Sequence, residues 1–235
     1  TLTSANNNIF LGRCAAGNAT ITGADNIAFG FGTGKNLTSG TDNIFIGKEA
    51  VCDGTVTGDQ NIVIGSHAGK KLTSGDRNIF LGDEAGACNT TGSRNFIAGT
   101  NAGLTGTCSC DNVIIGINAG YANNALSNIF LGRCAGRDNS TGCYNIYLGC
   151  KTGQEATTGC YNIFFGHEAV SGGVVTGNDN ISVGRNSGCC LTSGACNIFL
   201  GLGAGKKITT AGDNIMIGRQ VASNSQATAC ANIVM

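Results

Sequence analysis

A short apolar segment recurs along this chain at nearly constant spacing. An asparagine is followed by three mostly apolar residues and then by a glycine, as in Asn43-Ile44-Phe45-Ile46-Gly47. The asparagine returns every 16 to 18 residues, fourteen times in all. A short β-prone run bounded by turn-forming residues is typical of a strand. The pattern therefore predicts one strand per repeat.

The remainder of each repeat predicts two bends. A looser template, G-x-x-A-G followed by T-[TS]-G, is seen in residues 65–75. A repeat of this length is too short for two packed helices, and the helical spacing of apolar residues is absent. We therefore expect an all-β fold, a parallel β-solenoid of about fourteen coils, with residues 1–235 as a single repeat domain.

Two columns of the repeat have predicted structural roles. We expect the asparagines to stack as a ladder of side-chain amides, each bonded to its neighbours above and below. We expect the glycines to take positive φ at the bends, where other residues are strained. The ladder comprises Asn26, Asn43, Asn61, Asn78, Asn95, Asn112, Asn128, Asn145, Asn162, Asn180, Asn197 and Asn214. The bend glycines are Gly12, Gly30, Gly47, Gly65, Gly82, Gly99, Gly116, Gly132, Gly149, Gly166, Gly184, Gly201 and Gly218.

Alternation along the strand separates its residues into two faces. The first and third positions are nearly uniform, as in Ile44 and Ile46, and we assign them to the interior of the coil. The second position then faces outward, although it is large and apolar in twelve of fourteen coils. Soluble monomers rarely expose so long an apolar column, so it predicts an interface between copies of the chain. The predicted interface residues are Phe10, Phe45, Val63, Phe80, Ile97, Ile114, Phe130, Tyr147, Phe164, Phe199, Met216 and Val234.

The predicted interface leads to an expected oligomeric state. Identical columns on identical chains favour closed cyclic symmetry, and three flat faces can meet around one axis. We therefore expect a homotrimer. The alternative is a coil broad enough to enclose both faces of its strand.

Composition and charge exclude several classes of partner. Fourteen basic and 14 acidic residues cancel and are scattered without runs, which argues against nucleic acid. No apolar stretch reaches the length of a transmembrane helix, so we expect no membrane insertion. The chain begins without methionine and stops inside a repeat, so we expect a segment of a longer fibre protein.

Thirteen cysteines and two histidines are the candidates for chemistry. Most cysteines occupy unrelated positions of the repeat, and only Cys143 and Cys160 share a column on adjacent coils. Their spacing does not fit a zinc site, so we expect small apolar thiols in a reducing compartment, with disulfides as the alternative. His67 and His167 have no column of nucleophiles nearby. We therefore expect no catalytic residue, metal site or cofactor.

A column of threonines leaves a second function open. A flat outward row of threonines on a solenoid can bind ice, but several coils lack the threonine. Ice binding is therefore the alternative function. A polysaccharide-active enzyme is less favoured, because the carboxylates are dispersed and do not line one groove. The column comprises Thr22, Thr57, Thr91, Thr141, Thr158, Thr176 and Thr210.

The motif Φ-x-Φ-G-x-x-A, with Φ apolar, resembles the YadA-like head repeats of trimeric autotransporter adhesins and the related repeats of phage tail fibres. It is present at residues 44–50 and 129–135, and the resemblance covers nearly the whole chain. The resemblance implies a left-handed parallel β-roll in a tight trimer. This sequence departs from the adhesins in having asparagine where serine is common, a longer unit, and neither stalk nor anchor.

These observations predict a structural protein rather than an enzyme. We expect a segment of a viral tail fibre or surface adhesin used for host attachment, located on a virion surface or at the cell exterior. Its expected partners are other copies of the chain and an unidentified host receptor, with a glycan as one candidate.

Overall fold

The computed structural model describes residues 7–17, 20–223 and 230–235. The chain folds as a parallel β-solenoid in which each coil of about 17 residues supplies one strand and a returning loop. It divides into two compact units, Thr1–Ile115 and Gly116–Met235. The all-β solenoid expected from the repeat is confirmed.

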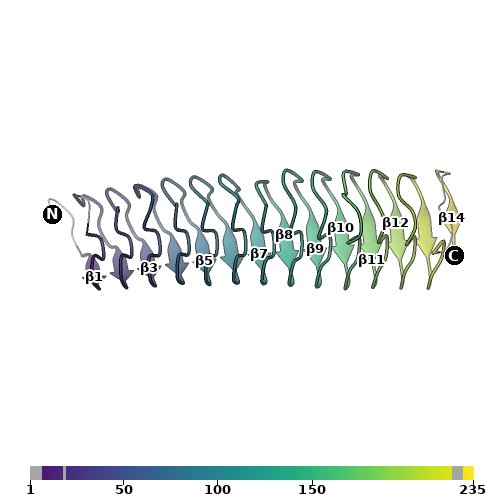
Figure 1. Cartoon of the computed structure of the whole chain (residues 1–235). Helices are drawn as coiled ribbons and strands as arrows, with labels where there is room; N and C mark the ends of the chain where they lie inside the picture. Colours follow the sequence, from purple (N-terminus) through teal and green to yellow (C-terminus); the bar gives the residue numbers. More distant parts are fainter. Residues whose placement is uncertain (1–6, 18–19, 224–229) are drawn as a thin grey trace. The chain divides into compact units, whose positions relative to one another are not determined.

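The first unit stacks its strands in sequence order. They are β1 (Ile9–Leu11), β2 (Ile27–Phe29), β3 (Ile44–Ile46), β4 (Ile62–Ile64), β5 (Ile79–Leu81), β6 (Phe96–Ala98) and β7 (Val113–Ile115). Each strand pairs in parallel with the next, so that Ile44 lies beside Ile62 and Phe45 beside Val63. In Figure 1 each arrow of this unit is followed by a loop that returns to the start of the next strand.

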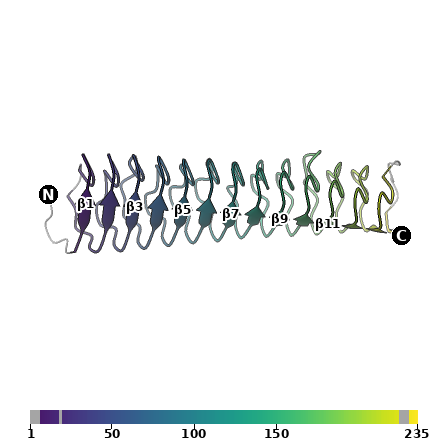
Figure 2. The ribbon, with the colours of Figure 1, turned by 90° about the horizontal axis from the view of Figure 1, so that it is seen from below.

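The second unit repeats this arrangement. Its strands are β8 (Ile129–Leu131), β9 (Ile146–Leu148), β10 (Ile163–Phe165), β11 (Ile181–Val183), β12 (Ile198–Leu200), β13 (Ile215–Ile217) and β14 (Ile233–Val234). Ile163 lies beside Ile181 although their repeat is one residue longer than the preceding one. The extra residue is taken up in the loop, so the strand register is unchanged. Figure 2 shows the same coil path recurring within each unit.

The interior of each unit is filled by the middle residue of every strand. Phe45, Phe80 and Phe164 are fully buried, and alanines such as Ala85 pack from the loops. In the second unit the ring of Tyr147 stacks between those of Phe130 and Phe164, with centroids 5.0 and 4.8 Å apart. The middle residues, which are large in every coil except those of Ala28 and Ser182, therefore form a continuous core in each unit.

This core shows that the face assignment made from the sequence was wrong. The column expected to form the interface lies inside the coil, and its members from Phe45 to Met216 are at most 1% exposed. The asparagine and the middle residue are two positions apart and therefore share a face. Burial of the asparagine amide takes the middle residue inside with it, and the first and third positions face outward. The residues that were predicted to form the interface and instead lie in the buried column are Phe45, Val63, Phe80, Ile97, Ile114, Phe130, Tyr147, Phe164, Phe199 and Met216. Phe10 and Val234 belong to the same column in β1 and β14.

The asparagine column forms a buried ladder of amide hydrogen bonds. Nδ2 of Asn78 donates to Oδ1 of Asn61 (3.1 Å) and to the carbonyl of Gly92 across the coil (2.8 Å). The backbone N–H of Asn78 donates to the same Asn61 oxygen at 2.9 Å. Ladder residues from Asn26 to Asn214 are at most 2% exposed. In this coil the amide therefore joins its strand to the strand before it and to the loop opposite. Asn128 differs, because its Nδ2 donates to Oδ1 of Asn123 at 3.2 Å and to the carbonyl of Gly142 at 2.9 Å.

Replacing a ladder asparagine by aspartate tests this bracing. Asn78→Asp removes both Nδ2 hydrogen bonds and places a carboxylate next to two carbonyl oxygens, so we expect the free energy of unfolding to fall by about 3 kcal/mol in urea titrations. The control is Asn178→Asp on the exposed surface. There Oδ1 only accepts the N–H of Cys160 at 2.8 Å, as Asp76 accepts that of Asp59. Equal losses in the two variants would contradict the ladder's role.

Most of the bend glycines lie where the backbones of successive coils pass close to each other. All thirteen have φ between 128° and 147°. A Cβ on Gly132 would lie 2.5 Å from the carbonyl oxygen of Gly149 in the next coil. Both conformation and space therefore exclude a side chain at this column.

A second glycine in most bends packs against the side chain of a middle residue. A Cβ on Gly136, for example, would lie 2.8 Å from the ring of Phe130. Two coils carry valine at this position instead, and the next coil then has a smaller middle residue: Val51 precedes Val63, and Val170 precedes Ser182. A larger side chain in the bend of one coil is thus compensated by a smaller middle residue in the next coil.

Two glycines of one bend distinguish the cost of placing a side chain on left-handed backbone from the cost of a steric clash with the core. Gly203 and Gly205 have nearly equal φ, 63° and 60°, but their Cβ atoms would lie 3.8 Å from Gln220 and 2.5 Å from Phe199. We expect Gly203→Ala to lower the free energy of unfolding by about 1 kcal/mol, the cost of left-handed backbone. Gly205→Ala should cost roughly 1–3 kcal/mol more, because it also overpacks the core. Similar midpoints in thermal unfolding would contradict this account.

The hydroxyl of Tyr147 is a polar group left alone in the core. It is fully buried and has no partner in hydrogen-bonding geometry among the described residues. Burial raises the pKa of Tyr147, and the nearby Asn162 amide only partly offsets that effect. We expect Tyr147→Phe to raise the free energy of unfolding by about 1 kcal/mol, because no partner is lost. The reverse change, Phe164→Tyr, should lower it, and a loss of stability in Tyr147→Phe would show that the hydroxyl is satisfied.

Candidate interaction surface

The outward residues of the strands form an uninterrupted apolar face in each unit. They occupy the first and third strand positions and include neither polar nor charged residues in the described strands. Phe29 is 51% exposed and Phe165 54%. The apolar face consists of Ile9, Leu11, Ile27, Phe29, Ile44, Ile46, Ile62, Ile64, Ile79, Leu81, Phe96, Ala98, Val113 and Ile115 in the first unit. In the second unit it consists of Ile129, Leu131, Ile146, Leu148, Ile163, Phe165, Ile181, Val183, Ile198, Leu200, Ile215, Ile217 and Ile233.

The apolar face is large enough for a protein interface. From the exposed fractions of its side chains, the face of one unit presents on the order of 800 Å², which is what each partner contributes to a standard interface. Typical soluble monomers have a largest apolar patch of roughly 300–600 Å². The exposed apolar column therefore consists of the first and third strand residues and not of the middle residues expected from the sequence.

Two rows of mostly polar residues border this face. The N-terminal edge is formed by the residue before each ladder asparagine, and the C-terminal edge by the residue after each bend glycine. The N-terminal edge comprises Asn7, Asp25, Asp42, Gln60, Arg77, Arg94 and Asp111 in the first unit, and Ser127, Tyr144, Tyr161, Asp179, Cys196, Asp213 and Ala231 in the second. The C-terminal edge comprises Arg13, Phe31, Lys48, Ser66, Asp83 and Thr100 in the first unit, and Ile117, Arg133, Cys150, His167, Arg185, Leu202 and Arg219 in the second. Every one of these residues is exposed or half-buried.

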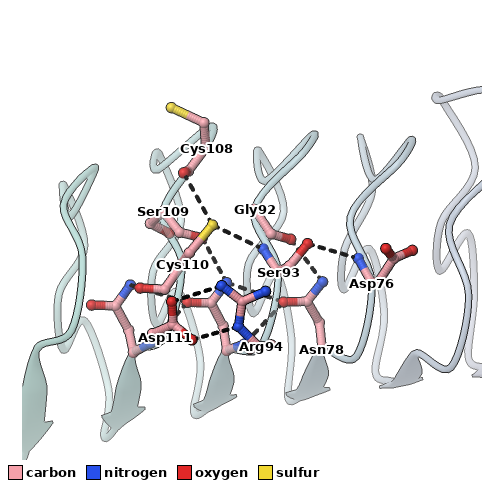
Figure 3. Close-up of polar contacts among 11 residues, drawn as sticks. Asp76, Asn78, Gly92, Ser93, Arg94, Cys108, Ser109, Cys110 and Asp111 are labelled. Atoms are coloured by element: carbon pink, nitrogen blue, oxygen red, sulfur yellow. Dashed lines mark hydrogen bonds and ion pairs between the residues drawn. The ribbon is translucent and has the colours of Figure 1, made fainter.

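Neighbouring coils contact each other along the edges. Arg94 and Asp111 form a two-pronged ion pair with N···O distances of 2.6 and 2.9 Å, seen in Figure 3. The Arg94 guanidinium lowers the pKa of the Asp111 carboxyl. In the second unit the rings of Tyr144 and Tyr161 stack with centroids 5.1 Å apart. The edges are thus ordered rows of side chains rather than loose loops.

Several cysteines have a backbone role that the sequence did not reveal. Two positions before the ladder asparagine, a side-chain acceptor receives the N–H of the preceding coil. Ser93 Oγ accepts from Asp76 at 3.0 Å, and Cys110 Sγ accepts from Ser93 at 3.3 Å, as Figure 3 shows. Cys160 and Cys230 act in the same way. Thiols therefore replace hydroxyl and carboxylate groups in one structural column that also contains Asp59, Asp76 and Asn178.

Two of the thiols have a raised pKa. All thirteen cysteines are free in this structure. Burial and the neighbouring Asp53 carboxylate raise the pKa of Cys52 to about 11, and burial also raises the pKa of Cys190. Raised values disfavour the thiolate, which is the reactive form.

The hydrogen bonds of His67 have a mainly structural role. Nε2 of His67 bonds Oε2 of Glu49 in the preceding coil at 2.9 Å, and Nδ1 bonds Oγ of Ser66 at 3.0 Å. The order serine, histidine, glutamate resembles a nucleophile, base and acid, but His67 and Glu49 are partly open to water on a bend. In the described part of the chain, no group of three His, Cys, Asp or Glu residues could hold a metal ion.

The threonine column lies on another part of the surface. Thr22, Thr57, Thr91, Thr141, Thr158, Thr176 and Thr210 are all exposed. A threonine beside this column bonds the next coil, since Thr90 Oγ1 donates to the Thr107 carbonyl at 3.0 Å. The exposed hydroxyl row is consequently one side chain wide.

A shallow groove at the C-terminal edge of the second unit is strongly basic. It has a volume of about 290 Å³ and is lined by Arg185, Lys206, Lys207 and Arg219 together with uncharged residues. Its described lining contains no carboxylate. The groove is therefore a place where negative charge from another molecule would be stabilised.

Comparison of this chain with protein-family models, with curated proteins and with solved structures finds no match. In the described residues, no helix is both long enough and apolar enough to cross a membrane.

Proposed function

We propose that this chain is a structural segment of a fibre or surface adhesin that works by packing against other copies of itself. The apolar face is the observation that supports this most strongly. Each unit already buries its own middle residues and asparagines, so the outward isoleucines and leucines are not needed for its core. Packing these faces together would remove them from water, which is the main favourable term in association.

A second copy of the chain fits the apolar face better than an unrelated partner. The face repeats at the strand spacing of about 4.8 Å, and another copy presents apolar rows with the same repeat. Flat, identical faces close around an axis by cyclic symmetry, and we propose three copies. The resemblance to repeats of trimeric adhesins supports the same number.

The proposed assembly leaves the loops free for a receptor. Exposed loop residues vary from coil to coil, whereas the strands are nearly uniform. Variable loops on a rigid scaffold are the usual location of recognition. We therefore propose host attachment by a viral tail fibre or surface adhesin, at a virion or cell surface, with a glycan as one candidate receptor.

Ice binding is the second candidate, and the exposed threonine row supports it. Thermal hysteresis of the purified chain separates the two functions. Ice binding would give a freezing-point gap that Thr91→Lys and Thr158→Lys abolish, whereas a fibre segment gives no gap.

Self-association is tested by the native mass in light scattering. The chain has a mass of 23.6 kDa, and we expect a species of about three chains. Ile79→Lys combined with Ile163→Lys should give single chains, because each change places a charge in the middle of an apolar interface.

The matched control places the same charges on another exposed surface. Thr91→Lys with Thr158→Lys should leave the mass unchanged, because both threonines lie outside the apolar face. A wild-type chain that remains a soluble monomer at high concentration would contradict the proposed function.

A further inference from the structure

The two edges of the apolar face carry complementary charges within each coil. In four coils both edge residues are charged, and in all four the signs are opposite. The coil of β5 shows this most clearly, because both of its signs are reversed relative to the other three. The pairs are Asp42 with Lys48, Arg77 with Asp83, Asp179 with Arg185 and Asp213 with Arg219. All eight side chains are exposed.

These eight charged side chains have no ion-pair partner among the described residues. Their one side-chain hydrogen bond joins Nε of Arg77 to the Gln60 amide at 3.1 Å. The two members of a pair cannot reach each other in one chain, because a strand with its flanking residues separates them by roughly 15–20 Å.

The remaining edge charges behave differently. Arg94 is paired with Asp111 in the next coil, and Thr100 stands opposite Arg94 on the other edge. Arg13, opposite uncharged Asn7, lies over the ring of Phe31 at 5.3 Å. Arg94 and Arg13 thus face uncharged residues across the strand, whereas the eight side chains, none of which forms an ion pair within the described residues, face opposite charges.

We propose that these charged edges fix the direction and register in which copies of the chain pack. The copies run in the same direction, coil matched to coil, around an axis parallel to the stack of coils. The N-terminal edge of one copy then meets the C-terminal edge of the next at the same coil, and each of the four pairs becomes an ion pair between chains. This inference rests on the proposed self-association through the apolar face and adds its geometry.

Antiparallel packing is disfavoured by the edges of the second unit. With the copies reversed, the N-terminal edges of two faces would meet each other, as would their C-terminal edges. The charged residues of the N-terminal edge in this unit are the acidic Asp179 and Asp213. Those of the C-terminal edge are basic, Arg133, Arg185 and Arg219, so reversal would bring like charges together.

A shift of register is disfavoured in the same unit. Moving one copy by a single coil places Arg185 opposite Tyr161 or Cys196, according to direction. The same shift places Arg219 opposite Cys196 or Ala231. The matched register alone gives both arginines a carboxylate, and it brings Asp179 and Asp213 to the basic groove that has none of its own.

Zero-length crosslinking of the full chain tests the geometry directly. A carbodiimide joins a carboxylate to an amine only when the two are in contact. In an equal mixture of ¹⁴N- and ¹⁵N-labelled chains, we expect a mixed-isotope peptide pair joined between Asp42 and Lys48. Lys48→Arg, which keeps the charge and removes the amine, should abolish it. Mixed-isotope products from Lys48 to carboxylates other than Asp42 alone would overturn the proposal.

Charge reversal tests whether the edges specify assembly. We expect Asp42→Lys with Arg77→Asp to weaken association about tenfold or more at low salt, because both ion pairs become repulsive. Lys48→Asp with Asp83→Lys should have the same effect, and all four changes together should restore association. The loss should shrink at high salt, where exposed charges are screened.

The outcomes separate this inference from the function on which it rests. If the wild-type chain assembles and reversing one edge leaves its association constant unchanged, the charge register is wrong while self-association stands. If the wild-type chain does not assemble at all, both fail. Because the eight side chains are exposed, each variant should keep the circular dichroism of the wild type.

Discussion

Each coil of this protein depends on one buried amide. Asn78 joins its strand to the preceding strand by donating its backbone N–H and Nδ2 to Oδ1 of Asn61, and it joins the opposite loop through a second Nδ2 hydrogen bond. A coil of about 17 residues is too small to hold its shape by apolar burial alone. The amide supplies the missing cross-connection, and because it is buried its hydrogen bonds do not compete with water.

The orientation of the whole strand follows from that amide. The asparagine points inward, so the middle strand residue does too, and the large rings then pack over glycines that leave room for them. The first and third positions are forced outward, although they are as apolar as the core. An exposed apolar face of this size would be unfavourable in an isolated soluble protein, but it would be useful in the assembly that we propose. Its apolar residues repeat at the same spacing as the coils.

The sequence was sufficient to predict the architecture, but not to predict which face of each strand is buried. The spacing of Asn43, Asn61 and Asn78 determines the coil length, and the glycine columns mark the bends. Uniformity of Ile44 and Ile46 was interpreted as a sign of burial, whereas a uniform column can equally be an outer face that meets copies of itself. The useful signal was the asparagine, which shares the face of Phe45 by simple alternation.

The roles of the cysteines and of the edges could not be obtained from the repeat alone. Cys110 and Cys160 accept backbone N–H groups in a column that also contains aspartate, serine and asparagine, and the sequence places these residues in one column without showing what their side chains bond. The opposite charges of Arg77 and Asp83 have meaning only after both are known to border the same face.

The edge charges also bear on how such a protein changes over generations. Contacts between in-register strands reach only the next coil, so a gene duplication that adds one coil lengthens the stack without disturbing its cross-section. Beyond the new coil, however, the sequence of signs along the edges moves out of step with that of the parent chain. In the assembly that we propose, a lengthened descendant would therefore match its own kind better than its ancestor, and the two lineages would sort into separate assemblies even when made in the same cell.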